Sequence, residues 1–264
     1  MKFSQKLDQA INKNKSLLCV GLDPSIVKGQ TLTEKGLTLY QFNKWIITQT
    51  ADFVCAYKPN IAFYEALGIE GLKSLKLTIE FLHEKYSHIP IILDAKRSDI
   101  ESTSEMYAKA IFDYFKADAT TVNPYFGFDS LRPFFKRFDR GIIVLCKTSN
   151  PGAGDFQDLE INGQPLFLKI AKKIHIWDKK YRNLLMVVSA TYPRDLLEIR
   201  KIAPQMTFLV PGIGTQGGNL QKTLKYGLRP DGQGLIISSS RSIIYAQDPR
   251  SAAQKLRNEI NKYR

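Results

Sequence analysis

Short apolar runs alternate with longer amphipathic segments along the whole chain. Eight runs are apolar at almost every position, and they lie at residues 17–23, 52–58, 89–95, 119–124, 141–147, 184–190, 207–212 and 234–240. Runs of this length that are apolar on both parities are typical of parallel strands covered on both faces. The pattern therefore predicts eight buried strands.

The segments between these runs have helical periodicity. In residues 99–115 the apolar side chains that fall close to one helical face are Ile100, Tyr107, Ile111, Phe112 and Phe115. Residues 181–203 are typical of a strand followed by a helix that begins at a proline. Helices are therefore expected between the strands.

Eight strands that alternate with helices favour a single (β/α)8 barrel over a doubly wound open sheet. The length of 264 residues agrees, because about 250 residues are typical of this barrel. No linker or change of composition divides the chain, so residues 1–264 are expected to form one domain. Longer gaps after Asp23, Lys58 and Lys147 predict extended loops or extra short helices.

The charge of the chain limits the classes of partner. A formal net charge of +13 is compatible with nucleic acid, an anionic membrane or an anionic substrate. Lysine and arginine are spread along the sequence without a basic tail, which favours a solubilising surface over a nucleic-acid-binding one. No apolar stretch approaches the roughly 20 residues that span a bilayer, and the charged N-terminus does not resemble a secretion signal. We expect neither a nucleic-acid partner nor a membrane.

The three cysteines indicate the compartment. Cys19, Cys55 and Cys146 each lie in an apolar run, and no two of them have Cys-x-x-Cys spacing. Such residues are expected to be reduced members of the core, as in a reducing compartment. We therefore expect a cytoplasmic protein.

Charged residues gather where the predicted strands end. The residues at these ends are Asp23, Lys58, Asp94 with Lys96, Lys147 and Arg241. The active site of a (β/α)8 barrel lies at the C-terminal ends of its strands. Asp94 and Lys96 are two residues apart, so on a strand they point the same way. These residues therefore predict a charged site at the mouth of the barrel.

Structural explanations exist for single members of this set. Asp99 could cap the helix that follows, and Asp94 with Lys96 could be a plain ion pair. Asp23 and Lys58 add two more opposite charges at the same end of the barrel. Alternating carboxylates and ammonium groups in a partly desolvated mouth are costly unless they have a function. The functional interpretation is therefore favoured.

A glycine-rich segment follows the seventh strand. Residues 210–218, VPGIGTQGG, have the spacing of a dinucleotide-binding fingerprint, but that fingerprint belongs to the first βα turn of its fold. In a barrel, the loops after strands seven and eight form a phosphate site, where backbone N–H groups approach an anion. Gln216 adds a donor there and Arg241 a bidentate charge. The sequence thus predicts a small phosphorylated substrate whose reacting part lies over Asp94 and Lys96.

A family signature covers the same residues. Residues 93–103, LDAKRSDIEST, match the pattern Asp-x-Lys-x-x-Asp-Ile-x-x-Thr, and GLDPS, YKPN, TSNPGA, PGIGTQGG and SSRSIIYA follow the family order over nearly the whole chain. The chain thereby resembles the orotidine 5′-phosphate decarboxylases, specifically the bacterial subgroup with longer loops. The resemblance implies a (β/α)8 homodimer without cofactor or metal. It would convert orotidine 5′-phosphate to UMP and CO2 in de novo pyrimidine biosynthesis.

The resemblance also implies roles for the charged residues. Lys58, Asp94, Lys96 and Asp99 would form the catalytic tetrad. Lys96 would stabilise and protonate the carbanion at C6 of the pyrimidine. Asp99 and Thr103 would reach into the site of the neighbouring subunit, toward the ribose.

The remaining substrate contacts follow from the same resemblance. Asp23 and Lys58 would bind the ribose, Ser149 the pyrimidine edge, and Gln216 with Arg241 the phosphate. The residues that would wall the apolar pocket near the departing CO2 are Ile100, Leu145, Pro211 and Ile213.

Two other enzyme classes use similar residues. Metal-dependent sugar-phosphate decarboxylases and synthases share the Asp-x-Lys-x-x-Asp arrangement but keep an acidic ligand where this chain has Lys58. A Schiff-base aldolase needs an uncharged lysine, whereas the carboxylates beside Lys96 favour its charged form. The metal-free decarboxylase is therefore preferred. The sequence leaves open whether the chain is part of a fusion with orotate phosphoribosyltransferase, the enzyme of the preceding step in this pathway.

Overall fold

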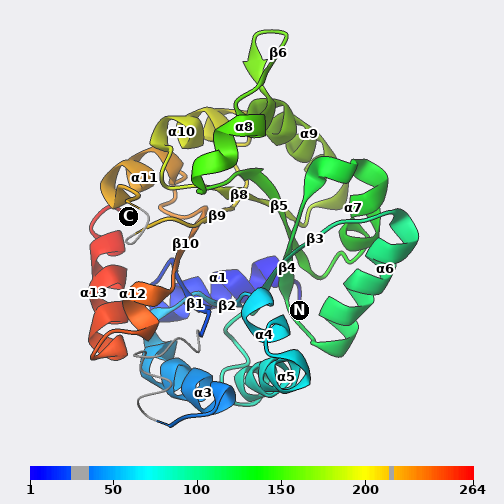
Figure 1. Ribbon diagram of the computed structural model, residues 1–264. Helices are drawn as coiled ribbons and strands as arrows, with labels where there is room; N and C mark the ends of the chain where they lie inside the picture. Colours follow the sequence, from blue (N-terminus) through cyan, green and yellow to red (C-terminus); the bar gives the residue numbers. More distant parts are fainter. Residues whose placement is uncertain (25–35, 214–216) are drawn as a thin grey trace.

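Eight parallel strands close into a barrel in the computed structural model, which describes residues 1–24, 36–213 and 217–264 (Figure 1). The sheet order is β2-β1-β10-β9-β8-β5-β4-β3, so each strand pairs with the next barrel strand along the chain. The two end strands are joined by the bridges Tyr57–Ile91 and Asn60–Asp94. The predicted (β/α)8 barrel is confirmed.

Each of the eight apolar runs coincides with most of one barrel strand, although β2 and β3 extend one and two residues beyond their runs. The strands are β1 (Leu18–Leu22), β2 (Ala56–Pro59), β3 (Ile92–Arg97), β4 (Ala119–Val122), β5 (Gly141–Lys147), β8 (Leu184–Val188), β9 (Phe208–Val210) and β10 (Leu235–Ser239). Almost all of their residues are buried, because the barrel interior covers one face and the helices cover the other. This double burial is the reason for the runs that are apolar on both parities.

Helices surround the barrel (Figure 1). Those between or after the strands are α3 (Leu39–Thr50), α4 (Ala62–Glu65), α5 (Gly68–Lys85), α6 (Glu101–Lys109), α7 (Phe128–Phe135), α8 (Gly154–Gln157), α9 (Leu166–Tyr181), α10 (Pro193–Ile202), α11 (Leu220–Gly227), α12 (Arg241–Ile244) and α13 (Pro249–Asn261). Helix α10 begins at Pro193, as the sequence predicts.

One helical prediction needs correction. The segment 99–115 is an α-helix only over α6 and continues as a π-helical turn, η2 (Ala110–Tyr114). Ile111, Phe112 and Phe115 are buried as expected, but Ile100 precedes the helix and is 61 % exposed. Ile100 has an extended ψ of 154°, so its side chain does not continue the helical face.

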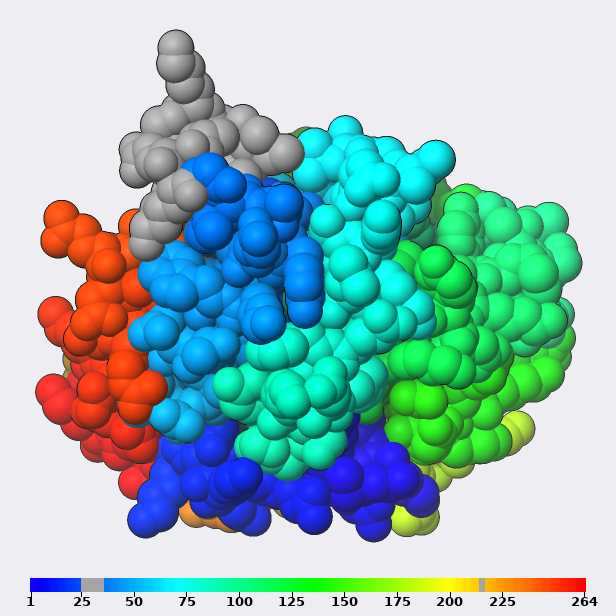
Figure 2. Space-filling model, turned by 90° about the horizontal axis from the view of Figure 1, so that it is seen from below, coloured from blue at the N-terminus to red at the C-terminus, as the bar shows by residue number. Residues whose placement is uncertain are grey.

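Helix α1 (Phe3–Asn14) covers the N-terminal end of the barrel, and Figure 2 shows this blue segment spread along one side of the molecule. Lys6 Nζ forms a buried ion pair of 2.7 Å with Asp118 Oδ2, just before β4. A Cβ at Gly141 would lie 2.4 Å from the ring of Phe3, so only glycine allows this approach to β5. The opposite end of the barrel is left for the site.

The extra elements expected in the long gaps lie at the C-terminal end of the strands. Helix α4 follows β2, and β5 is followed by η4 (Pro151–Ala153), α8 and the antiparallel pair β6 (Glu160–Ile161) and β7 (Gln164–Pro165). Short 3-10 turns also occur at η1 (Ala51–Phe53) and η3 (Pro124–Phe126). The gap after Asp23 lies mostly in residues 25–35, outside the described residues.

Candidate active site

A cavity of about 800 Å³ opens at the C-terminal ends of the barrel strands. Its charged and polar wall residues include Asp23, Lys58, Asp94, Lys96, Thr121, Thr148, Ser149, Asn150, Ser238, Ser239, Ser240 and Arg241. Its apolar wall includes Phe63, Leu145, Val187, Leu209, Pro211 and Ile213. The predicted charged mouth and apolar pocket therefore occupy the same cavity.

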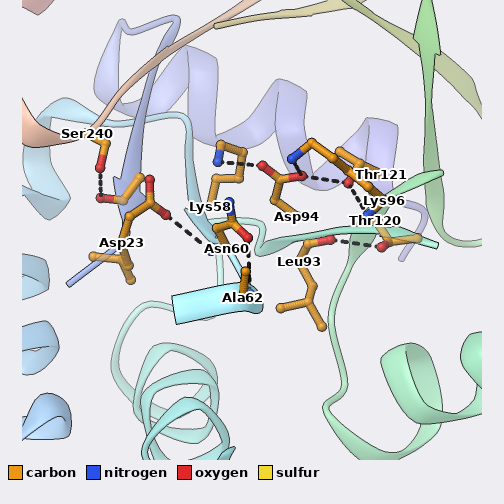
Figure 3. A network of polar contacts seen from close by, with 12 residues as sticks. Asp23, Lys58, Asn60, Ala62, Leu93, Asp94, Lys96, Thr120, Thr121 and Ser240 are labelled. Atoms are coloured by element: carbon orange, nitrogen blue, oxygen red, sulfur yellow. Dashed lines mark hydrogen bonds and ion pairs between the residues drawn. The ribbon is translucent and has the colours of Figure 1, made fainter. Parts of the chain in front are cut away.

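Three charged side chains form a row across the mouth (Figure 3). The carboxylate of Asp94 accepts hydrogen bonds from Lys58 Nζ at 3.0 Å and from Lys96 Nζ at 2.7 Å. The side chains of Lys58 and Asp94 are 8 % and 10 % exposed, whereas that of Lys96 is 48 % exposed. The row therefore leads from a buried ammonium group to one that faces the open cavity.

The ionisation of this row follows from its geometry. Burial alone raises the pKa of Asp94, but the charges of Lys58 and Lys96 outweigh burial and hold that pKa well below its usual range. Burial lowers the pKa of Lys58, and the charges of Asp94 and Asp23 outweigh it, so the net direction is upward. At neutral pH, Asp94 is an anion and Lys58 a cation.

Lys96 reaches Asp94 by a route that strand parity does not predict. Its φ of 48° is left-handed, and the register between β3 and β4 shifts between Leu93 and Arg97. Lys96 therefore belongs to a bulge and not to a regular strand. Both side chains line the cavity at the barrel mouth as expected, but the alternation of side chains along a regular strand is the wrong reason.

Asp23 lies beside this row, at the end of β1. Its Oδ1 atom accepts the backbone N–H of Asn60 at 3.2 Å, which ties β1 to the turn after β2. Ser240 Oγ donates to the carbonyl of Gly21 at 3.3 Å. A Cβ at Gly21 would lie 2.8 Å from Cβ of Ser240, so glycine is needed for the close approach of β1 and β10.

The segment after β5 brings Thr148, Ser149 and Asn150 to the cavity. The N–H of Thr148 donates to Gln157 Oε1 at 2.9 Å, and Gln157 Nε2 donates to Thr148 Oγ1 at 2.7 Å. Lys147 does not line the cavity. Its buried ammonium group pairs with Asp158 and Asp195 instead. Ser149 therefore lies where the sequence predicts it, on a segment fixed by α8.

The opposite side of the cavity is formed after β9 and β10. Pro211, Gly212 and Ile213 follow β9, and Arg241 is the first residue of α12, separated from β10 by Ser240 alone. Gly212 has a φ of 100°, a conformation that favours glycine. Gln216, the other expected phosphate contact, lies outside the described residues.

Three predicted site residues do not line the cavity of their own chain. Asp99, Ile100 and Thr103 follow β3 and lie outside its described wall. Asp99 Oδ1 accepts the N–H of Ile100 at 2.7 Å, and the N-cap of α6 is Ile100, without a side-chain cap. The alternative in which Asp99 caps the helix is therefore not supported.

Other residues of the cavity were not anticipated. Thr121 on β4 donates its hydroxyl hydrogen to Asp94 Oδ1 at 2.7 Å, and Phe63, Ser238, Ser239 and Tyr245 complete parts of the wall. The available signal for Thr121 was a polar residue inside a buried strand that pairs with β3. Using it requires the register of the two strands, which the pattern does not provide.

The described residues contain no group of three or more His, Cys, Asp or Glu side chains that could hold a metal ion. At the end of β2, where a metal-dependent sugar-phosphate decarboxylase would have an acidic ligand, Lys58 pairs with Asp94.

Within the ranges that the structure describes, no helix is both long and apolar enough to cross a membrane.

Known proteins resemble the chain over its full length. It is 47 % identical to the orotidine 5′-phosphate decarboxylase of Cellvibrio japonicus (99 % of this chain, 98 % of the relative) and 43 % identical to that of Ralstonia nicotianae (100 % of both). A solved OMP decarboxylase from Leishmania donovani has a TM-score of 0.89 at 40 % identity, covering 100 % of this chain and 98 % of its own.

A second solved structure, the UMP synthase of Leishmania donovani, has a TM-score of 0.91 at 42 % identity. It covers 100 % of this chain, and this chain spans 56 % of the synthase. The model of the orotidine 5′-phosphate decarboxylase / HUMPS family matches residues 16–256. The chain belongs to the orotidine 5′-phosphate decarboxylase / HUMPS family.

Proposed function

We propose that residues 1–264 form one domain that decarboxylates orotidine 5′-phosphate to UMP and CO2. The observation that carries this proposal is the Lys58–Asp94–Lys96 row, which places a buried anion beside an exposed ammonium group at the barrel mouth. Family membership supports the substrate, and the single barrel supports the single domain. The paired Lys58 at the end of β2 favours this reaction over that of a metal-dependent sugar-phosphate enzyme.

The reaction needs a cation at one carbon atom. When the bond between C6 and the carboxylate breaks, its electron pair stays on C6 in the ring plane, where the π-system cannot delocalise it. The ammonium group of Lys96 would stabilise this pair and then transfer a proton to C6. Because the Lys96 side chain is 48 % exposed into the cavity, it is placed to meet the substrate.

Asp94 would act on the substrate carboxylate. Its depressed pKa keeps it negative, so a substrate carboxylate nearby is repelled until CO2 departs. Such a contact acts on the difference between the ground state and the transition state. Lys58 holds Asp94 from the other side and, with Asp23, would bind the ribose.

The rest of the substrate would follow the length of the cavity. Ser149 would bind the pyrimidine edge, Leu145, Pro211 and Ile213 would surround the departing CO2, and Arg241 would hold the phosphate together with Gln216. Arg241 lies two residues after the end of β10, at the start of α12, which is a usual phosphate position in this barrel. The binding energy of the remote phosphate would favour desolvation at C6.

The active form would be a homodimer with shared sites. Asp99 and Thr103 lie outside the cavity of their own chain, which supports the proposal that they serve the neighbouring one. The described cysteines are buried free thiols, as expected of a protein in the reducing cytoplasm.

The test follows the ultraviolet absorbance of orotidine 5′-phosphate mixed with purified protein and a chelator. Loss of substrate at the same rate with and without chelator is expected. No loss under either condition would contradict the proposed function, and loss only without chelator would favour a metal enzyme.

A further inference from the structure

The pairing of β3 with β4 is interrupted at the charged row. Leu93 lies opposite Thr120 and Arg97 lies opposite Val122. Between these two pairs β3 contributes residues 94–96, whereas β4 contributes Thr121 alone. Thr121 is therefore the single residue of β4 that faces the bulge carrying Asp94 and Lys96.

The hydroxyl group of Thr121 joins both parts of this bulge. It donates to Asp94 Oδ1 at 2.7 Å and accepts the backbone N–H of Lys96 at 2.9 Å, as Figure 3 shows. One hydrogen and two lone pairs allow both bonds at once. Thr121 is 1 % exposed, so water does not readily replace either bond.

The same carboxylate oxygen also binds the lysine ammonium group. Lys96 Nζ lies 2.7 Å from Asp94 Oδ1, the atom that receives the Thr121 hydroxyl. Thr121 thus contacts Lys96 in two ways. Its hydroxyl binds the backbone N–H of Lys96 directly, and through Asp94 Oδ1 it is linked to the Lys96 ammonium group. A β-branched side chain in a buried strand has little rotational freedom, which makes Thr121 a stiff support.

We propose that Thr121 is a positioning residue that fixes the distance between the Asp94 carboxylate and the Lys96 ammonium group during decarboxylation. This inference rests on the proposed function. Without the hydroxyl, the N–H of Lys96 loses its partner and the bulge can relax. The contacts that act only in the transition state then weaken, whereas the distant ribose and phosphate contacts remain.

The test compares Thr121→Val with Thr121→Ser, which respectively remove and keep the hydroxyl. Thr120→Val is the matched control, because Thr120 is the buried neighbour on β4 whose hydroxyl donates to the Leu93 carbonyl at 2.8 Å and does not line the cavity. We expect Thr121→Val to lower kcat roughly ten- to hundredfold, since small displacements of catalytic groups have such effects. We expect KM to stay within about threefold, and Thr121→Ser and Thr120→Val to keep kcat near that of the wild type.

Several outcomes would overturn the inference. It fails if Thr121→Val keeps the kcat of an active wild type, if Thr121→Ser does not restore kcat, or if Thr120→Val loses as much. If Thr121→Val does not fold, Thr121→Cys replaces it, because a thiol is close in shape to the serine hydroxyl but a weak hydrogen-bonding group. An inactive wild type would overturn the proposed function and this inference with it. An active wild type whose Thr121→Val variant keeps its kcat would overturn this inference alone.

Discussion

At the scale of the residue, the left-handed backbone of Lys96 is the least usual feature of the site. A non-glycine residue with a φ of 48° carries conformational strain and persists only where its surroundings hold it. Here Asp94 binds the ammonium group and Thr121 binds the backbone N–H. This backbone conformation brings the Lys96 ammonium group to the Asp94 carboxylate, so that both groups face the same part of the cavity.

Replacing Lys96 tests whether this point is the reacting centre. We expect Lys96→Ala to lower kcat by roughly 10²- to 10⁴-fold or more, because it removes both the cation and the proton donor. The matched control is Lys116→Ala, since Lys116 is also left-handed, with a φ of 62°, but is exposed and lies outside the cavity wall. Steady-state decarboxylation assays measure both variants. Near-normal turnover by Lys96→Ala would contradict the mechanism.

The buried pair of Lys58 and Asp94 gives stability a defined pH dependence. The pKa of Asp94 is lower in the folded chain than its ordinary value, so its contribution is present above about pH 4 and is lost as pH falls further. We expect Asp94→Asn to lower the free energy of unfolding by about 3 kcal/mol at neutral pH, because it leaves the buried Lys58 unpaired. The difference from the wild type should shrink below about pH 4.

Urea unfolding at neutral and acidic pH measures this effect. The control is Asp231→Asn, which breaks an exposed pair with Arg229 and should change the free energy of unfolding by at most about 1 kcal/mol. Equal stability of Asp94→Asn and the wild type at neutral pH would contradict the expected contribution.

The site residues differ in whether they could be predicted from the sequence. Asp94 and Lys96 could be identified from their types and their place at a strand end. The bulge could not, because lysine has no intrinsic preference for a left-handed backbone. Thr121 becomes visible only when the register of β3 and β4 is known.

At the scale of the element, α8 fixes the segment that follows β5. Two consecutive residues at its end hold two consecutive residues at the strand end, because Asp158 pairs with Lys147 and Gln157 binds Thr148. Lys147 is buried, and its Nζ atom lies 4.6 Å from the centre of the Tyr192 ring. These contacts should fix the position of Ser149.

Loosening this segment should affect substrate binding more than stability. Gln157→Ala removes both bonds to Thr148, so we expect KM for orotidine 5′-phosphate to rise several-fold at nearly constant melting temperature. Gln164→Ala serves as the control, because Gln164 lies on β7 of the same connection and its side chain accepts a hydrogen bond from the exposed Lys172, away from the cavity wall. An unchanged KM for Gln157→Ala would show that α8 does not position the pocket.

The eight barrel strands could be predicted because burial on both faces leaves a continuous apolar run. The small hairpin of β6 and β7 could not be predicted in this way, because its strands are two residues long and not buried. Its Asn162–Gly163 turn, with φ of 53° and 69°, is a hairpin signal that such short flanking strands leave weak. The π-helical turn after α6 has no comparable signal in the sequence.

At the scale of the whole molecule, the two ends of the barrel differ in what covers them. Helix α1 closes the N-terminal end, whereas large apolar side chains are exposed beside the mouth after β3 and β4, where Ile100 is 61 % and Tyr125 is 86 % exposed. Exposed apolar groups of this kind mark interaction surfaces. They lie on the turns next to Asp99, which is where a second subunit would have to pack for that residue to be shared.

The composition of such a shared site could not be derived from the strand pattern of a single chain. The pattern places Asp99 after β3, but the distance between two subunits depends on a surface that the chain presents only after folding. The resemblance to the decarboxylases provided the expectation that Asp99 and Thr103 cross to the neighbour, and it stays a prediction.

Subunit complementation tests this prediction. Lys96→Ala and Asp99→Ala should each be inactive alone, because each homodimer then lacks one group in both sites. Co-expression in equal amounts should give half mixed dimers, in which one site carries both defects and the other carries neither, so about a quarter of the wild-type activity returns. If both groups served the same chain, every site would keep one defect and the mixture would remain inactive. Recovered activity near a quarter therefore requires that Asp99 completes the site of its partner.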